Sequence, residues 1–555
     1  MDLKIALAQS NFTLGDIKGN AEKIKRDIAE AEMKNADMIV FPELALCGYP
    51  PLDLLLEKEF IDTNEKMIRE IALSIENIVA IVPYARRKNN NLWNAAAIIQ
   101  NAKIHSHVHK NHLTSYDIFD EKKYFASSKD TRPTELSIKG KNYKLGIQIG
   151  EDLLNETHKN KIRQELIDQG ADIILNLSAA PFKLGKNDDR IALVSEQVKE
   201  AKIPYLYCNL VGGQGDLIFD GNSFAIDAKG LLSSHCSAFQ EDLAYCHFID
   251  KVTQTHVKVP QIGPLESLRL ALDLGIKDYF HKSGFKTAVI GLSGGIDSAL
   301  VAVLAAEALG AENIYGIALP SQFSSNHSIE DAKKLAENLG MPFDLIKIKP
   351  MYDTFLKALS GQFAGSPFGL AEENLQARIR GSLLMSVANK KNSLLLTTGN
   401  KTEIALGYCT LYGDMCGALA PLADLNKLDV YALSRHLNEQ YGYDVIPQNT
   451  IDKIPSAELA DDQYDPFNYD VISPLVDQLL ANDALEDIIA KTGDRELVLK
   501  TKRMIRLSEY KRWQAAPALR VNSKAFSRGP IMPLVNKFRE QGPEIRDQKS
   551  EIRNE

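Results

Sequence analysis

The sequence is short of several features that would assign it to a special class of protein. Only six of its 555 residues are cysteine and none forms a Cys-x-x-Cys pair, which argues against a disulfide framework and a thiolate zinc site. No apolar run approaches the length of a membrane span, and the opening MDLKIALAQS has no basic segment followed by an apolar one. The net charge of -8 comes without a basic block, so no nucleic-acid partner is indicated. These absences predict a cytoplasmic protein with reduced cysteines and no membrane contact.

What the sequence does contain is an alternation of strand-like apolar runs and helical patterns, which predicts an α/β protein. KIALAQ, a periodic stretch over 20–35 and ADMIVFPEL form the first strand–helix–strand unit, and further strand-like runs follow. A chain this long exceeds one hydrophobic core. The polar, proline-marked stretch over 250–265 is therefore interpreted as a boundary, with domains at 1–255 and 256–540 and a flexible tail at 541–555.

The sharpest signal is TAVIGLSGGIDSALVAVLAAEALG, a buried strand, a glycine-rich turn and a helix. Gly294 and Gly295 allow a tight turn, and the first turn of the helix presents free N–H groups and the positive end of its dipole, so an anion is expected there. The Walker A spacing is absent, and two glycines alone are equally compatible with an ordinary strand-to-helix turn.

The complete SGGIDS segment resembles the pyrophosphate loop of the ATP pyrophosphatases, which have a Rossmann-like (adenine nucleotide α hydrolase-like) fold. Together with ENLQARIRG at 373–381, LLLTTGNKTEIALGYCTLYGD from 394 and SEYKRWQAAP at 508–517, it resembles the NAD⁺ synthetases over most of residues 265–535. The resemblance implies that deamido-NAD⁺ is adenylated by ATP with release of pyrophosphate, and that ammonia then displaces AMP to form the amide of NAD⁺.

The same resemblance implies a set of binding residues. ATP is expected at Gly291, Leu292, Ser293, Gly294, Gly295, Ile296, Asp297, Ser298 and Thr398. Mg²⁺ is expected at Asp297 and Glu403, and deamido-NAD⁺ at Asn374, Glu403 and Lys511, with Lys427 near the phosphates.

In the first half, Glu43 follows a strand-like run in FPELALCGYPPLDLL and Lys110 follows another in HKNHLTSYDIFDEKKYF. Separately, each is compatible with a structural carboxylate or a solvated charge. Together with a third strand that ends in Glu-Asp, these segments resemble the nitrilase family, and more narrowly the glutaminase domains fused to NAD⁺ synthetases. The resemblance implies an αββα sandwich in which Glu43 is the base and Lys110 stabilises an oxyanion.

The nucleophile of that family is a cysteine directly before Glu-Asp, where this chain has Gly150. Of the residues expected to contact glutamine, Tyr116 and Lys186 are retained, whereas the family's serine corresponds to Ala180 and a proline to Thr114. Loss of a nucleophile removes nearly all covalent catalysis, often by ~10⁶-fold. We therefore expect a homo-oligomeric enzyme that uses mainly free ammonia.

Three alternatives stay open at this level. Gly150 could be an introduced change in a glutamine-dependent enzyme whose natural residue is cysteine. The first domain could be a non-catalytic scaffold that assembles the oligomer, or the second a different adenylating enzyme, such as a thiolating or GMP-forming one. Cys208, in YLYCNL, is a conceivable substitute nucleophile, but a small buried thiol is the favoured interpretation.

Overall fold

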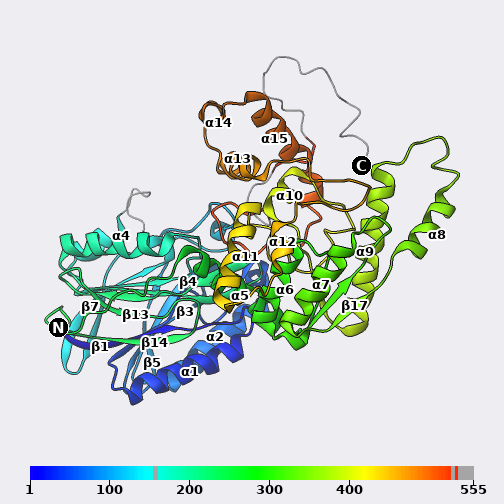
Figure 1. The fold of residues 1–555 in the computed structure, drawn as a ribbon. Helices are drawn as coiled ribbons and strands as arrows, with labels where there is room; N and C mark the ends of the chain where they lie inside the picture. Colours follow the sequence, from blue (N-terminus) through cyan, green and yellow to red (C-terminus); the bar gives the residue numbers. More distant parts are fainter. Residues whose placement is uncertain (154–160, 527–531, 536–555) are drawn as a thin grey trace. The chain divides into compact units, whose positions relative to one another are not determined.

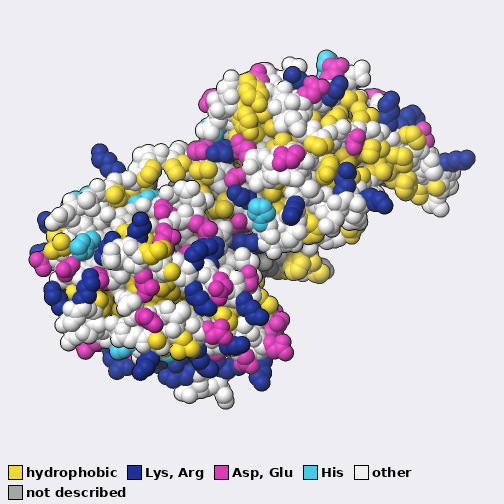
Figure 2. Space-filling model, turned by 90° about the horizontal axis from the view of Figure 1, so that it is seen from below, with side chains coloured by type: hydrophobic (Ala, Val, Ile, Leu, Met, Phe, Trp, Pro, Cys, Tyr) yellow, Lys and Arg dark blue, Asp and Glu magenta, His cyan; other side chains and the backbone are white. Residues whose placement is uncertain are grey.

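The computed structural model describes residues 1–153, 161–526 and 532–535, so the expected tail over 541–555 lies outside the described residues. The chain forms two compact units, Met1–Pro264 and Leu265–Glu555, and each is described by itself. On the face shown in Figure 2, Lys and Arg side chains are interspersed with Asp and Glu. No helix among the described residues combines the length and the apolar character needed to cross a membrane.

The first unit contains two six-stranded sheets (Figure 1). One has the order β14-β1-β2-β3-β4-β5, with β1 (Asp2–Gln9), β2 (Met38–Val40), β3 (Val79–Lys88), β4 (Asn91–Gln100), β5 (Lys103–His109) and β14 (Asp242–Ile249). The other has the order β13-β12-β9-β8-β7-β6, with β6 (Thr134–Ile138), β7 (Lys141–Ile149), β8 (Ile173–Ser178), β9 (Tyr205–Asn209), β12 (Phe224–Ile226) and β13 (Leu232–His235). A two-stranded ribbon is formed by β10 (Val211–Gln214) and β11 (Leu217–Asp220).

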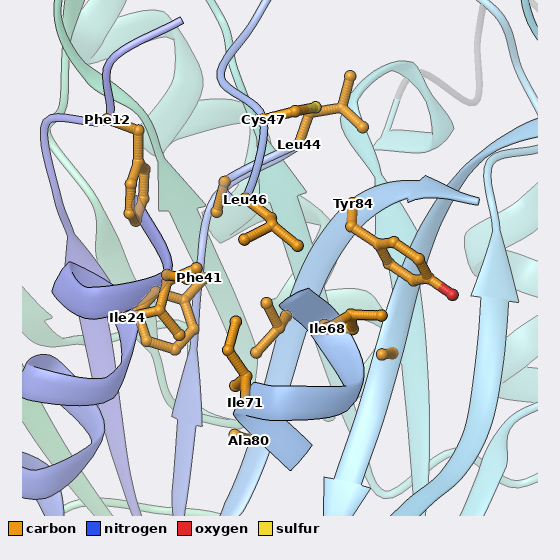
Figure 3. Packing of buried hydrophobic residues seen from close by; sticks show 14 of the residues in the cluster. Phe12, Ile24, Phe41, Leu44, Leu46, Cys47, Ile68, Ile71, Ala80 and Tyr84 are labelled. Carbon is orange, nitrogen blue, oxygen red and sulfur yellow. The ribbon is translucent and has the colours of Figure 1, made fainter. Parts of the chain in front are cut away.

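Alternating side chains explain why the two sheets stack. Along β1, Leu3, Ile5 and Leu7 enter the core shared with the second sheet, whereas Ala6 and Ala8 face a separate core. That separate core lies under α1 (Ile17–Met33) and α2 (Lys58–Leu73), and part of it is shown in Figure 3. A third core joins the second sheet to α3 (Ile162–Asp168) and α4 (Lys186–Ala201). The layers are therefore αββα, as the resemblance implied.

The second unit is built on a parallel sheet of order β17-β16-β15-β18. Its strands are β15 (Ala288–Gly291), β16 (Ile314–Ala318), β17 (Phe343–Leu345) and β18 (Leu394–Leu396). The chain moves from β15 to β16 and β17 in one direction, then returns to the other side of β15 with β18. The strand order thus reverses between β15 and β18, and ligands of such sheets bind at this point, beyond the carboxyl ends of the strands.

Helices cover this sheet and extend past it. They are α5 (Pro264–Ser283), α6 (Ile296–Leu309), α7 (Asn326–Leu339), α8 (Lys349–Leu359), α9 (Leu370–Lys391), α10 (Lys401–Leu406), α11 (Lys427–Tyr441), α12 (Gln448–Asp452), α13 (Tyr469–Ala481), α14 (Leu485–Thr492), α15 (Arg495–Leu507) and α16 (Glu509–Arg512). Helices α13, α14 and α15 pack on one another (Figure 1), around a core to which α10 also contributes.

Candidate functional site

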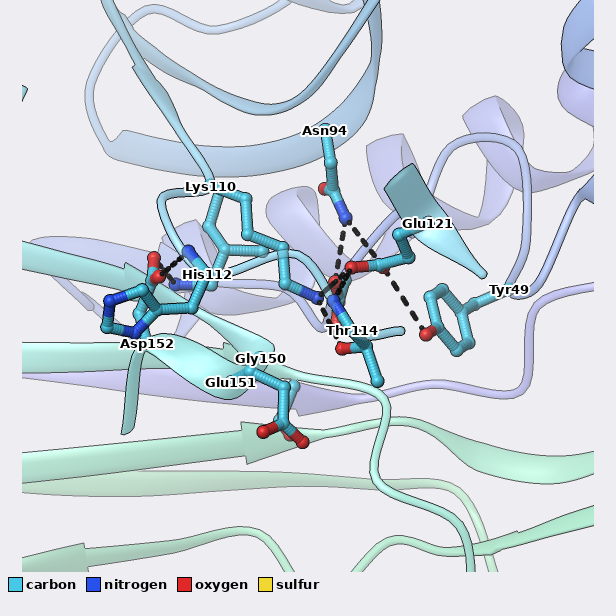
Figure 4. A network of polar contacts seen from close by, with 12 residues as sticks. Tyr49, Asn94, Lys110, His112, Thr114, Glu121, Gly150, Glu151 and Asp152 are labelled. Atoms are coloured by element: carbon cyan, nitrogen blue, oxygen red, sulfur yellow. Dashed lines mark hydrogen bonds and ion pairs between the residues drawn. The ribbon is translucent and has the colours of Figure 1, made fainter. Parts of the chain in front are cut away.

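In the first unit, Glu43 and Lys110 meet in a buried charged cluster, of which Lys110, Glu121 and Thr114 are labelled in Figure 4. Lys110 Nζ lies 2.7 Å from Glu43 Oε1 and 2.7 Å from Glu121 Oε2. It also lies 3.4 Å from Thr114 Oγ1. An ammonium has three N–H donors, so these three contacts use all of them.

Neutral donors hold the two carboxylates of this cluster in place. Asn94 Nδ2 donates to Glu43 Oε1 at 2.7 Å and to Glu121 Oε1 at 3.4 Å. The backbone N–H of Thr114 donates to Glu121 Oε2 at 2.8 Å, and the Tyr49 hydroxyl lies 3.4 Å from Glu121 Oε1. The cluster thus places two carboxylates against one ammonium in an apolar surrounding.

Burial decides how these groups ionise. Burial raises the pKa of Glu43 to about 7, although the Lys110 charge opposes the shift. Burial by itself would lower the pKa of Lys110, but the charges of Glu121 and Glu43 outweigh it and raise that pKa above its usual range. Lys110 is therefore a permanent cation, and Glu43 can exchange a proton near neutral pH.

Gly150 lies directly against this pair. It follows β7, begins the short helix η3 (Gly150–Leu153) and has a φ of +51°. A Cβ at this position would point at Glu43 Oε2, 2.6 Å away, and at Lys110 Nζ, 2.8 Å away. The structure brings Glu43, Lys110 and Gly150 together at one point, while their catalytic roles stay predictions.

Asp152 connects the turn at Gly150 to the segment that follows Lys110 (Figure 4). Its Oδ1 accepts from the backbone N–H groups of Asn111 at 3.1 Å and His112 at 2.7 Å, and its Oδ2 from Ile149 at 3.2 Å. Burial raises the pKa of Asp152 to about 6, and these backbone donors oppose the shift. Asp152 thereby positions Lys110 relative to the tip of β7.

The residues expected to contact glutamine come from three different segments of the first unit. The Tyr116 hydroxyl donates to Glu151 Oε1 at 2.6 Å, and the Tyr116 side chain is otherwise exposed. The backbone N–H of Ala180 donates to Asn209 Oδ1 at 2.9 Å. Lys186 is the first residue of α4, but its side chain lies outside the described residues.

Cys208 is no substitute nucleophile in this structure. Its side chain is fully buried between the two sheets, and its thiol contacts the carbonyl of Val40 at 3.3 Å. Burial raises the pKa of this thiol well above its usual range, so it stays protonated and unreactive. The favoured interpretation from the sequence, a structural buried thiol, agrees with this position.

In the second unit, the segments that follow β15 and β18 border one cavity of about 380 Å³. Because β15 and β18 are neighbouring parallel strands, their carboxyl ends bring SGGIDS and TTGNKTE to the same place. Among its lining residues are Gly291, Leu292, Ser293, Gly295, Ile296, Asp297, Ser298, Asn374, Thr398, Glu403 and Lys427. Gly294 and Lys511, also expected at the site, are not among the lining residues.

The SGGIDS loop is held in shape by its two serines. The hydroxyls of Ser293 and Ser298 are 3.1 Å apart, and Ser298 Oγ donates to the carbonyl of Gly295 at 3.0 Å. Gly294 has a φ of +76°, and a Cβ there would lie 2.3 Å from the carbonyl oxygen of Ser328. Glycine is thus required at 294 by the loop backbone and the close approach of α7.

Asp297 and Glu403 face a shared cation. Lys427 Nζ lies 2.5 Å from Asp297 Oδ2 and 3.4 Å from Glu403 Oε1. Burial raises the pKa of Glu403 to about 8, and the negative charge of Asp297 adds to that shift. For Lys427, burial alone would lower the pKa, but Asp297 and Glu403 outweigh it and raise it.

The donor set fits a magnesium ion that arrives with a nucleotide. Mg²⁺ prefers oxygen ligands and is usually held by one or two carboxylates plus substrate phosphates and water. Asp297 and Glu403 supply two such carboxylates on one cavity. Across the described residues, no group of three His, Cys, Asp or Glu is arranged to hold a metal by itself.

Asn374 and Lys511 both contact the loop over 407–410. Thr410 Oγ1 donates to Asn374 Oδ1 at 2.7 Å, and Lys511 Nζ donates to the carbonyls of Gly407 and Cys409, each at 2.9 Å. Lys511 therefore supports this wall of the cavity, and its contact with substrate stays a prediction.

Three residues that organise these sites were not predicted from the sequence: Asn400, Glu121 and Asp152. Asn400 caps α10 and donates from Nδ2 to Asp297 Oδ1 at 2.9 Å. A signal existed for it, because Asn400 and Glu403 have the spacing of a capping box before a helix. Glu121 belongs to the FDE segment that follows Lys110, and Asp152 follows Glu151. The identity of a charged residue does not show by itself that the residue is buried.

Comparisons with known proteins cover both units. The carbon-nitrogen hydrolase family matches residues 4–256, and the NAD synthase family matches residues 270–515. A glutamine-dependent NAD(+) synthetase of Synechocystis is 45% identical over 97% of this chain and 99% of its own length. One from Thermotoga maritima is 38% identical, with the same two coverages. The solved structure of a glutamine-dependent NAD+ synthetase from Acinetobacter baumannii with adenosine diphosphate is similar at a TM-score of 0.78, with 34% identity, 97% of this chain and 99% of that one covered.

Proposed function

The chain belongs to the family of two-domain NAD(+) synthetases, and from this premise we propose that it amidates deamido-NAD⁺ with free ammonia as its main nitrogen donor. The enzyme is a ligase that forms a C–N bond and uses ATP. The proposed nitrogen donor differs from that of the relatives named above, which are glutamine-dependent. The observation that carries it is Gly150, which stands where the family's attacking thiol is expected.

The synthetase reaction uses the cavity of the second unit. The nicotinate carboxylate attacks the α-phosphorus of ATP, and the bond to pyrophosphate breaks. Ammonia then attacks the acyl carbon, and the C–O bond to AMP breaks as the nitrogen gives up a proton. We assign Ser293, Ser298 and the loop amides to the leaving pyrophosphate, because a helix N-terminus after a glycine turn binds anions.

Asp297 and Glu403 are proposed to hold Mg²⁺, which neutralises charge on the phosphates when bound. Asn374, Thr398, Glu403, Lys427 and Lys511 are proposed as nucleotide contacts. All but Lys511 line the cavity.

Three features of the first unit argue against glutamine as the donor. Gly150 offers no nucleophilic atom, and the four cysteines of this unit, Cys47, Cys208, Cys236 and Cys246, are all buried. Each of these thiols has a pKa raised by burial. Lys110 donates its three N–H groups to Glu43, Glu121 and Thr114, so an oxyanion would have to displace one of them.

The domain boundary, the oligomeric state and the cellular location expected from the sequence remain proposals. A division near residue 255 is supported by the family matches, which end at 256 and resume at 270, and by compact units that meet at Pro264 and Leu265. A homo-oligomer in the cytoplasm is likewise proposed.

The test compares NAD⁺ formation with ammonium and with glutamine in ammonia-free buffer. Ammonium should support turnover, and glutamine should give only the rate of its ammonia contamination. Asp297→Ala should abolish AMP release with either donor. Efficient use of glutamine by the unaltered chain would overturn the nitrogen-source proposal.

Two substitutions at residue 150 separate the thiol from its steric cost. Gly150→Ala and Gly150→Cys place the same Cβ against Glu43 and Lys110, but only cysteine adds a nucleophile. We expect Gly150→Cys, and not Gly150→Ala, to gain glutamine hydrolysis that a further Glu43→Gln change removes. Hydrolysis by Gly150→Ala would show that another residue attacks.

A further inference from the structure

The ammonium of Lys427 occupies the space between the two proposed metal ligands. Lys427 is the first residue of α11, and its side chain is 3% exposed. Its Nζ contacts Asp297 Oδ2 at 2.5 Å and Glu403 Oε1 at 3.4 Å. Its backbone is fixed as well, because Lys427 N donates to Thr402 Oγ1 at 3.3 Å. One buried ammonium thus lies between two partly buried carboxylates.

The remaining oxygens of the same carboxylates are held by one residue. Asn400 Nδ2 donates to Asp297 Oδ1 at 2.9 Å, and Asn400 N donates to Glu403 Oε2 at 3.2 Å. Each of the four carboxylate oxygens therefore has a donor. Once both are ionised, two carboxylates that share one ammonium repel each other unless a cation lies between them.

We propose that Lys427 is an exchangeable internal cation, which holds the place of the metal between Asp297 and Glu403 until magnesium arrives bound to ATP. This inference rests on the proposed function. A lysine suits the role because its ammonium is a compact charge at the end of a flexible stem. The triphosphate offers the ammonium a new anionic partner, so Lys427 can leave the carboxylates as the metal takes its place.

The proposal has a consequence for the order of binding. A metal ion without nucleotide must displace the ammonium and leave it buried and unpaired, which is costly. Metal and nucleotide together avoid this cost, since the phosphates receive the ammonium. Lys427 thereby couples the two ligands and discourages binding of free metal at the site.

The test measures binding of Mn²⁺, as a paramagnetic probe for Mg²⁺, by electron paramagnetic resonance of the free ion. The full-length wild type is compared with Lys427→Met, without nucleotide. Lys427→Met should bind Mn²⁺ at least about tenfold more tightly, because the competing charge is gone. Lys453→Met is the matched control, since Lys453 lines the same cavity but pairs with Glu458. It should bind Mn²⁺ as the wild type does.

Equal Mn²⁺ affinities of the wild type and Lys427→Met would overturn the inference. Tight binding that persists when Asp297→Asn is added to Lys427→Met would also overturn it, because the metal would then lie elsewhere. Should Lys427→Met fold poorly, Mg²⁺ in the refolding buffer ought to recover it by replacing the lost cation. Absence of that recovery would count against the inference.

A separate readout distinguishes this inference from the proposed function. ATP-dependent AMP release by the wild type tests the function alone. Normal AMP release with equal Mn²⁺ affinities would contradict only the role of Lys427. No AMP release from deamido-NAD⁺ and ATP would contradict the proposed function.

Discussion

Both sites of this protein bury a lysine between two carboxylates. Lys110 lies between Glu43 and Glu121, and Lys427 between Asp297 and Glu403. Once both carboxylates are ionised, such a group of three carries an excess negative charge, which the surrounding structure must accommodate. We therefore expect each cluster to lower the free energy of unfolding while it provides charges that a ligand or a reaction can use.

The first prediction concerns this cost at Glu43. Its pKa of about 7 in the folded chain exceeds the ordinary 4.5, so the folded chain binds the proton more tightly. The contribution of Glu43 to stability is thus fully present below pH 4.5 and is lost as pH rises through about 7. Glutamine at this position does not titrate. The free energy of unfolding of Glu43→Gln, minus that of wild type, should therefore rise by about 1–3 kcal/mol between pH 5 and pH 8.

Urea unfolding at a series of pH values measures the difference. The control is Glu70→Gln, which changes an exposed carboxylate that pairs with Lys66 on the surface of α2. Its difference from wild type should stay nearly constant with pH. A Glu43→Gln difference that is equally flat would show that Glu43 is not strained in the folded chain.

At the level of elements, strand and helix ends place the chemistry. The tips of β15 and β18 carry SGGIDS and TTGNKTE, and the N-termini of α6, α10 and α11 carry Asp297, Glu403 and Lys427. Residues at such ends have backbone positions fixed by the element and side chains free to meet a ligand. Asn400 joins two of these ends, since it caps α10 and reaches Asp297 beside α6.

The second prediction tests the contact between Asn400 and Asp297 with the substitution Asn400→Asp. Aspartate keeps the cap of α10 but replaces a donor that faces Asp297 with a negative charge. Asn426→Asp is the control, because Asn426 caps α11 and likewise donates to a carboxylate, Asp477, at 2.8 Å. Both changes should destabilise by about 1–3 kcal/mol.

Only Asn400→Asp should weaken binding of the non-cleavable α,β-methylene analogue of ATP, by about tenfold or more, through repulsion at Asp297. Calorimetric titration measures it. Equal loss in both variants would place the effect in folding rather than at the site.

At the scale of the whole molecule, each unit has hydrophobic cores of its own. Three cores stack the layers of Met1–Pro264, and separate clusters lie in Leu265–Glu555. The cavity beside SGGIDS is lined by residues of the second unit, and the charged cluster of Glu43 is formed by residues of the first.

The third prediction follows from these separate cores. Scanning calorimetry should show two unfolding components. The methylene analogue of ATP with Mg²⁺ should raise only one of them, since a ligand stabilises the unit that binds it. Glu43→Gln at pH 8 should raise only the other. A single transition that moves as a whole in both experiments would show that the units unfold together.

Much of the fold was predictable because local patterns carried it. Strands β1 and β2 lie at KIALAQ and ADMIVFPEL, and α1 covers most of the periodic stretch over 20–35. These patterns arise from the period of the side chains along each element, which neighbours in sequence already determine. Exact ends were less well predicted: helix α1 begins at Ile17, before the periodic stretch over 20–35.

The sequence by itself determined the α/β class of the chain, the SGGIDS turn and the lack of a side chain at residue 150. These are properties of short segments or of single residues. Only the tertiary structure decided that Glu121 shares Lys110 with Glu43, that Asn400 and Lys427 bridge Asp297 and Glu403, and that Cys208 is sealed between two sheets. The reason is physical: burial and charge pairing depend on residues far apart in the chain, and they set the pKa of a carboxylate or a thiol more strongly than its sequence neighbours do.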